Sequence, residues 1–207
     1  MHPRLAAALT AQLERRSAAL AAGARSVGWK IGGGIPEVDE LTGGKPTIGH
    51  LTSASQHEPG GTHSAAGAGA LHADTEVVIE VGRDGVVAGL RVGLELVDLA
   101  REPGGLETIV AGNVLHQAFA VGPLRAATGA AEARAVIDGE IRARGRTSAD
   151  HADTVELVAR QLEALGESLR PGDLIFSGSV TQVPVAPGHE VAAEIDGLGR
   201  VSLVIAA

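Results

Sequence analysis

The sequence predicts a single mixed α/β domain in which β-strands dominate. Short runs rich in Val, Ile and Leu recur along the chain, and turn pairs such as Asp-Gly separate several of them, as in strands joined by tight turns. Only two segments have the apolar spacing of an amphipathic helix. The 207 residues, 44% of them hydrophobic, suffice for one core, and no repeat or domain boundary divides residues 1–207.

The first third of the chain predicts a helix, a strand and a long loop. Within residues 1–24, a helix over 4–22 places leucines on one face and ends at Gly23. Residues 26–31 are strand-like. Residues 42–70 are rich in Gly, Ser, Thr, Ala and His, which predicts a loop with at most brief strands. Long loops in compact domains often serve as lids, so we expect this segment to cover a site.

The rest of the chain, after residue 70, is predicted to contain more strands and one further helix. Residues 76–92 form a hairpin around Arg83-Asp84-Gly85, and residues 153–165 have the clearest helical stripe. Residues 106–119 are ambiguous, and the Ser/Gly/Thr run after Phe176 is expected to be a loop. The other expected strands are a pair over 133–145 around Asp138-Gly139, and single runs at 94–99, 174–176, 191–195 and 201–205.

Composition argues against several classes of protein. The formal net charge is −8 and no Lys/Arg cluster occurs, which disfavours nucleic-acid binding. There is no cysteine, so neither disulfides nor thiol chemistry is available. Arg4, Glu14, Arg15 and Arg16 interrupt the Ala-rich start, which excludes a signal peptide, and no run reaches the ~18 apolar residues of a membrane span. We therefore expect a cytoplasmic protein.

Three acidic residues, a closely spaced pair and one further along the chain, suggest a metal site. In a strand, Asp74 and Glu76 point to the same side, and two such carboxylates repel unless a cation lies between them. Glu95 stands inside an apolar run, where a charge needs a partner. Mg²⁺ and Mn²⁺ prefer oxygen ligands of this kind. Spacing alone favours the alternative, in which Asp74 and Glu76 lie at an exposed strand edge and Glu95 is a solvated helix residue.

Two further segments contain residues capable of binding an anion. Lys30 lies between Gly28 and Gly32, so its ammonium can reach into a pocket, bind a carboxylate or act as a base; it can also be a surface residue beside a turn. Residues 176–181, Phe-Ser-Gly-Ser-Val-Thr, offer hydroxyl and backbone N–H groups to a carboxylate or oxyanion, or form an ordinary polar loop.

Taken in order, these pieces resemble the fumarylacetoacetate hydrolase superfamily, and within it the 2-keto-4-pentenoate hydratase and 4-oxalocrotonate decarboxylase branch. The resemblance covers most of the chain and is strongest from Leu165 to Val204. It depends on these motifs: Gly28-Trp29-Lys30-Ile31-Gly32, Gly49-His50-Leu51, Asp74-Thr75-Glu76, Glu95-Leu96-Val97-Asp98, Val110-Ala111-Gly112-Asn113, Leu169-Arg170-Pro171-Gly172-Asp173, Val183-Pro184-Val185 and Gly197-Leu198-Gly199.

The resemblance implies a fold and a site. The fold is the β-roll of the family's C-terminal domain with flanking helices. A divalent metal, Mg²⁺ or Mn²⁺, is held by Asp74, Glu76 and Glu95, with Lys30 near the substrate. Histidines close to this site in sequence, His72 and His116, are candidates for proton transfer. The residues implied to line the substrate pocket are Asn113, Ser177, Ser179 and Thr181.

The chemistry implied is that of a lyase acting on a 2-oxo or 2-hydroxy-dienoic acid, which the metal stabilises as an enolate while a base moves a proton and water adds. Hydration is the leading expectation. Decarboxylation or C–C hydrolysis of a related 2-oxo acid on the same site is the nearest alternative. A catalytically idle homologue acting as a binding subunit is the third. A homo-oligomer is expected, because so few aromatic residues in a small domain favour burial at an interface.

Overall fold

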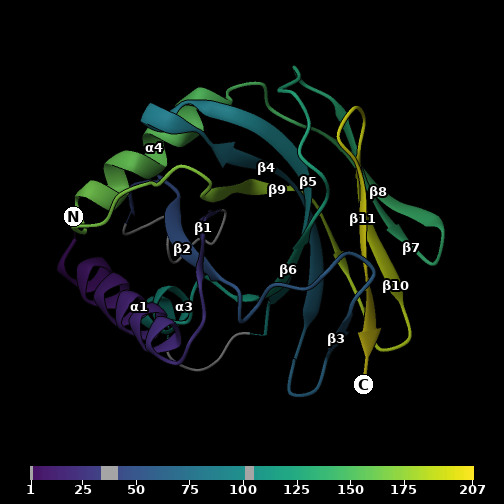
Figure 1. Cartoon of the computed structure of the whole chain (residues 1–207). Coiled ribbons are helices and arrows are strands. Elements are labelled where there is room, and N and C mark those ends of the chain that lie inside the picture. The colour runs from purple at the N-terminus through teal and green to yellow at the C-terminus, as the bar shows by residue number, and fades with distance from the viewer. Residues whose placement is uncertain (1, 34–41, 101–104) are drawn as a thin grey trace.

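The chain folds into two β-sheets packed against each other, with helices along one side (Figure 1). The structure is a computed structural model that describes residues 2–33, 42–100 and 105–207. Its α-helices are α1 (Pro3–Ala21), α3 (Gly105–Ala111) and α4 (His151–Glu163). None of the helices in these ranges is long and apolar enough to cross a membrane.

The larger sheet has six strands and curls around the site described below (Figure 1). Adjacent strands in this sheet run antiparallel, except that β1 and β9 run parallel to each other. In spatial order the strands are β2 (Thr47–Thr52), β1 (Ser26–Gly32), β9 (Leu174–Pro184), β4 (Leu71–Val81), β5 (Val87–Asp98) and β6 (His116–Val121).

The smaller sheet has five strands and packs on one face of the larger sheet. Its antiparallel hairpins turn at Asp138-Gly139 and at Asp196-Gly197. In spatial order the strands are β3 (Thr62–Ser64), β11 (Gly199–Ala206), β10 (Glu190–Ile195), β7 (Glu132–Ile137) and β8 (Glu140–Arg146).

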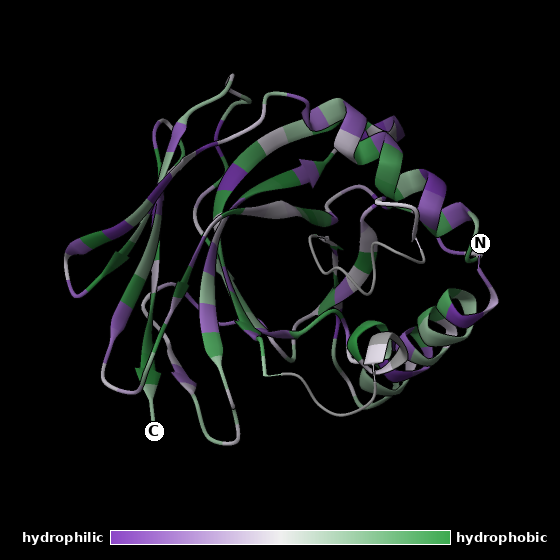
Figure 2. Ribbon diagram, turned by 180° about the vertical axis from the view of Figure 1, so that it is seen from behind, coloured by the Kyte–Doolittle hydropathy of each residue, from purple (hydrophilic) through white to green (hydrophobic). Residues whose placement is uncertain are grey.

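Strand alternation separates the core from the site. Alternate residues point to opposite faces of a strand, and Figure 2 shows the resulting change of hydropathy along the strands. In β4, Ala73, Val77 and Ile79 belong to the main core cluster. The residues between them face the opposite side of the sheet, where they meet a smaller apolar cluster of Leu51, Val78, Phe119, Leu174 and Phe176. The polar site lies on that second face.

The helices close the edge of the larger sheet near β1 and β2. Gln12 of α1 is fully buried and its amide donates to the carbonyls of Ile48 and Val110, which ties α1 to β2 and to α3. Arg16 stacks its guanidinium 4.7 Å from the Trp29 ring centroid. These contacts hold β1, the strand that carries Lys30, in place.

The predicted fold class, a mixed α/β β-roll with flanking helices, is confirmed, with three local corrections. The loop expected over 42–70 contains β2, which is buried throughout, and the short strand β3. Residues 94–99 continue the 76–92 hairpin, so that β5 is one strand of 12 residues. The ambiguous segment 106–119 holds most of α3 and the start of β6. The lid role expected for 42–70 stays a prediction.

A candidate metal centre

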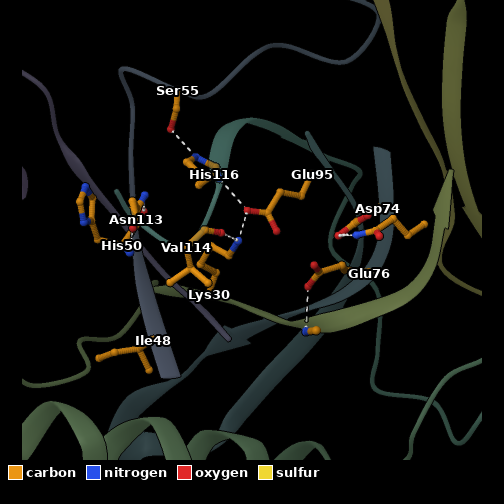
Figure 3. Close-up of polar contacts among 12 residues, drawn as sticks. Lys30, Ile48, His50, Ser55, Asp74, Glu76, Glu95, Asn113, Val114 and His116 are labelled. Carbon is orange, nitrogen blue, oxygen red and sulfur yellow. Dashed lines mark hydrogen bonds and ion pairs between the residues drawn. The ribbon is translucent and has the colours of Figure 1, made fainter. Parts of the chain in front are cut away.

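Three buried carboxylates meet on the site-bearing face of the larger sheet (Figure 3). Asp74 and Glu76 are two residues apart in β4 and therefore share a face. Glu95 lies directly opposite Asp74 in the paired strand β5. One oxygen from each carboxylate lies within 4.8 Å of the others, and the three residues are only 5%, 1% and 1% exposed. The pairing register thus brings together acids separated by about twenty residues of chain.

Glu95 is held by two cationic or polar partners on a single oxygen. Its Oε1 lies 2.6 Å from Lys30 Nζ and 2.6 Å from His116 Nδ1 (Figure 3). His116 in turn places Nε2 2.9 Å from the hydroxyl of Ser55. Because both contacts use Oε1, the second carboxylate oxygen is left for another ligand.

The carboxylates on β4 are each held by one contact from β9. The backbone N–H of Gly178 donates to Glu76 Oε2 at 2.8 Å, and the amide of Gln182 donates to Asp74 Oδ2 at 3.2 Å. Asp74 Oδ1 is buried without a hydrogen-bond partner among the described residues. A buried carboxylate oxygen without a donor is costly, which is an independent sign that a cation belongs beside it.

The electrostatics of the protein groups alone are unfavourable. Burial, together with the negative charge of Glu95, raises the pKa of Asp74 to about 7. Burial and the charges of Glu95 and Asp74 raise the pKa of Glu76 well above its usual value. Burial also opposes ionisation of Glu95, but Lys30 and His116 outweigh it and hold the pKa of Glu95 at about 2. One ionised and two protonation-prone carboxyl groups therefore share this site.

These residues fit a hard divalent cation. All three donors are carboxylate oxygens, which Mg²⁺ and Mn²⁺ prefer over the nitrogen and sulfur ligands of softer metals. A cation among them compensates the clustered negative charge and supplies a partner for Asp74 Oδ1. Asp74, Glu76 and Glu95 can thus hold a divalent metal, with water or substrate oxygens completing its coordination.

A strained turn holds Lys30 against Glu95. Besides its ion pair, Lys30 Nζ donates to the carbonyl of Val114 at 3.2 Å. Asn113, Val114 and Leu115 have φ of 66°, 54° and 65°, a run of left-handed conformations that non-glycine residues rarely adopt. Such strain often marks a functional site. Here the turn aims a backbone carbonyl at the ammonium, and the third N–H group of Lys30 has no partner among the residues that the structure describes.

A β-bulge in β9 explains the anchoring of Glu76. Ser177 and Gly178 lie between the register pairs Glu76–Ser179 and Val78–Phe176, opposite the single residue Val77. Gly178 has φ +101°, which glycine tolerates and other residues rarely adopt. The bulge turns the Gly178 N–H away from the ladder and toward the Glu76 carboxylate.

A cavity of about 540 Å³ opens beside the carboxylates, large enough for a small organic acid. Lys30 and the three carboxylates line it, as do residues of β9. The end of β8 and the start of α4 also contribute to its lining, with Arg146, Ser148, His151 and Thr154. Burial lowers the pKa of His151 below its usual value. No residue of the segment 42–70 is among those that line this cavity.

The serine run expected to be a loop is part of strand β9, and its members face different surroundings. Ser177 and Ser179 line the cavity. Their hydroxyls already donate to the carbonyls of Val77 and Thr181, so in this arrangement they can accept hydrogen bonds from a substrate and cannot donate to its carboxylate. Thr181 is buried and does not line the cavity.

The remaining predicted residues lie around the carboxylates and not in the cavity. The Asn113 side chain is fully engaged with the backbone of His50, accepting from its N–H at 2.7 Å and donating to its C=O at 2.9 Å. His116 contacts the Glu95 carboxylate. His72 places Nδ1 3.0 Å from the carbonyl of Ala70. Asn113, Thr181 and His72 are not among the residues that line the cavity.

Several site residues were not singled out from the sequence. Gln182 and Val114 hold Asp74 and Lys30, and Arg146 and His151 line the cavity. Gln182 could have been found from strand alternation. If residues 177–184 are assigned to a strand beside residues 71–81, the pairing of Gln182 with Asp74 follows. Nothing local marked Val114, because its role depends on an unusual backbone conformation.

Several solved structures share this fold. The structure resembles that of 4-oxalocrotonate decarboxylase from Pseudomonas putida G7, which was crystallised with magnesium and adipate, at a TM-score of 0.83 and 22% identity over 96% of this chain and 84% of that chain. Fumarylpyruvate hydrolase from Pseudomonas aeruginosa, crystallised with Mn²⁺ and pyruvate, gives 0.66 and 23% identity over 88% and 89%. 2-Hydroxyhepta-2,4-diene-1,7-dioate isomerase from Mycobacterium marinum gives 0.64 and 19% over 88% and 76%.

Sequence comparison is decisive for the family. No curated protein sequence matches the chain. The family model described as fumarylacetoacetate (FAA) hydrolase C-terminal, however, matches residues 49–206, which include all three carboxylates and the whole of β9. With about three quarters of the chain covered by that match, the protein belongs to the fumarylacetoacetate hydrolase family.

Proposed function

We propose that this protein is a divalent-metal-dependent lyase that hydrates a small 2-oxo or 2-hydroxy-dienoic acid. The observation that carries the proposal is the convergence of three buried carboxylates beside Lys30 on the wall of one cavity. Members of the family with known structures include a decarboxylase, a hydrolase and an isomerase of related oxo acids, which supports a shared enol chemistry and leaves the final step to be tested.

The carboxylates Asp74, Glu76 and Glu95 would bind the cation, which when bound supplies a Lewis acid for the oxygens of a 2-oxo acid. Gly178 and Gln182 orient two of these carboxylates, so the ligand oxygens are held before the substrate enters. Strand positions are rigid, which favours this kind of preorganised charge stabilisation.

Lys30 is the proposed acid–base residue. Its ammonium lies in the cavity wall with one N–H unpaired among the described residues, so it can stabilise negative charge developing on the substrate or exchange a proton with a carbon of the conjugated chain. Ser177 and Ser179 offer hydroxyl oxygens as acceptors for the 2-hydroxyl group of a dienol. We propose His116 as a positioning residue, since it contacts Glu95 and Ser55 and does not line the cavity.

The test is an assay of the Mg²⁺- or Mn²⁺-loaded protein with 2-hydroxypenta-2,4-dienoate. Loss of the dienol absorbance with uptake of one water and no release of CO₂ is the expected result. Release of CO₂ from a 2-oxo acid would replace hydration with decarboxylation on the same site. A protein that neither retains a divalent cation on dialysis nor turns over any 2-oxo acid would be an idle homologue, and the proposal would fail.

A further inference from the structure

Strand β8 carries three arginines, and among the described residues Arg146 is the one without an acidic partner. Alternation places Arg144 and Arg146 on the same face of the strand, whereas Arg142 lies at a register shift in its pairing with β7. Arg142 pairs with Glu140 at 3.0 Å, and Arg144 pairs with Glu132. Among the described residues no carboxylate lies within ion-pair distance of Arg146, whose single protein contact is a long hydrogen bond of 3.4 Å to the Ala130 carbonyl.

Arg146 also differs from its neighbours in where it lies, because it lines the cavity beside the metal centre. The preceding Gly145 lets β8 approach β9 closely: a Cβ atom there would stand 2.7 Å from the Val180 carbonyl oxygen. Val180 lines the cavity as well. The glycine thus lets the end of β8 lie against the strand that lines the cavity, and Arg146 is the residue of β8 that lines it.

The charges in the cavity are otherwise balanced. Lys30 is paired with Glu95, and the carboxylates of the triad are suited to a cation. His151, which also lines the cavity, has its pKa lowered by burial, which disfavours its charged form. Arg146 is therefore the cation in the described cavity lining that lacks a counter-charge.

We infer that Arg146 forms an anion subsite within this cavity, so that the preferred ligand is a 2-oxo acid carrying a second carboxylate at its far end. This inference rests on the proposed function, which puts the 2-oxo and first carboxylate groups at the metal centre. A guanidinium suits the far carboxylate because its planar array of N–H donors binds both oxygens at once. The hydroxyls of Ser148 and Thr154, which also line the cavity, already donate to Asp150, so the guanidinium supplies the donors to the far carboxylate.

The test compares acids of equal length with one or two carboxylates by calorimetry on the Mg²⁺-loaded protein. The pairs are 2-oxoglutarate with 2-oxopentanoate, 2-oxoadipate with 2-oxohexanoate, and 2-oxopimelate with 2-oxoheptanoate. At least one diacid should bind about 10-fold or more tightly than its partner, the effect of one good charge-assisted interaction. Arg146→Gln should abolish the preference while leaving the affinity for the monoacid unchanged, and Arg146→Lys should retain part of it.

Arg144→Gln is the matched control, since Arg144 lies on the same face of β8 but outside the cavity and should keep the full preference. Thermal unfolding of each variant establishes that it is folded. Equal affinity for diacid and monoacid in the wild type, or a preference that survives Arg146→Gln, overturns the subsite while leaving the proposed function standing. If no 2-oxo acid binds, the proposed function fails, and the subsite fails with it.

Discussion

Replacing Lys30 with methionine tests the metal centre through its effect on stability. Lys30 and Glu95 are 3% and 1% exposed and their charges are 2.6 Å apart. Removing one partner of a buried ion pair typically costs 3–5 kcal/mol because the other charge stays buried. His116 remains on the same Glu95 oxygen, so we expect the lower end, about 3 kcal/mol, or roughly 6–12 °C in the melting temperature of a domain of this size.

A bound cation should offset most of this loss. Saturating Mg²⁺ supplies positive charge beside Glu95, so the difference between Lys30→Met and wild type should shrink to about 1 kcal/mol or less. Turnover measured on the folded, Mg²⁺-loaded variant should still fall by about 10²-fold, the effect of a lost acid–base group. Lys45→Met is the control, because Lys45 is exposed and is the only other lysine of the chain.

The measurements are urea unfolding with and without Mg²⁺, followed by turnover. A metal-free Lys30→Met protein within about 0.5 kcal/mol of wild type, the usual range of surface substitutions, would refute the buried ion pair. An equal loss with and without Mg²⁺ would refute a cation site beside Glu95. The sequence alone gave no reason to expect a folding defect from this substitution, because burial of Lys30 follows only from contacts made by distant segments.

Three further predictions follow from the same contacts. The pKa of Asp74 is raised from 3.8 to about 7, so the stability contributed by its protonated form is complete below about pH 4 and is lost as the pH rises through 7. In urea unfolding, the metal-free protein should therefore lose about 1 kcal/mol of unfolding free energy between pH 6.5 and 8.5. Mg²⁺ should abolish this pH dependence. Asp74→Asn should raise metal-free stability at pH 8.5 and remove the thermal shift caused by Mg²⁺, whereas a melting temperature that still responds to Mg²⁺ would contradict its role as a ligand. Asn113→Ala should cost about 2 kcal/mol of unfolding free energy, because it leaves the buried backbone N–H and C=O of His50 unpaired, and an effect below about 0.5 kcal/mol would show that this clamp is unimportant.

The local pattern predicted those elements that local forces suffice to form. The alternation around 76–92 gave the β4–β5 hairpin, and the leucine and valine stripes gave α1 and α4. The strand β2 was missed because its composition is that of a loop. Its Thr47 and His50 are buried only because α1 and the turn at Asn113 come to cover them and hydrogen-bond its backbone.

Strand β9 was cut short for a related reason. Gly and Ser are depleted from strands, so the run after Phe176 reads as a loop when considered alone. It is a strand because β4 supplies ladder partners from Ser179 to Pro184, and its Gly178 accommodates a bulge. The same pairings decide the metal centre: Asp74 and Glu76 could be paired from spacing, but Glu95 joins them only through the β4–β5 register.

The arrangement of the larger sheet explains how a fold with a hydrophobic core tolerates so many buried charges. Four strands of this sheet, β1, β4, β5 and β6, each direct a polar side chain to one face. These side chains are Lys30, Asp74, Glu95 and His116. Their opposite faces contribute to the main apolar core, so the cost of burying charge falls on the site and not on the packing between the sheets. Without a cation, that cost raises the pKa values of Asp74 and Glu76, so both carboxyl groups tend to stay protonated. As the pH rises and they lose their protons, the stability of the fold decreases. A divalent cation binds the deprotonated carboxylates, so its binding releases their protons and stabilises the folded state. Metal affinity and the free energy of unfolding should therefore both depend on pH through the same carboxyl groups.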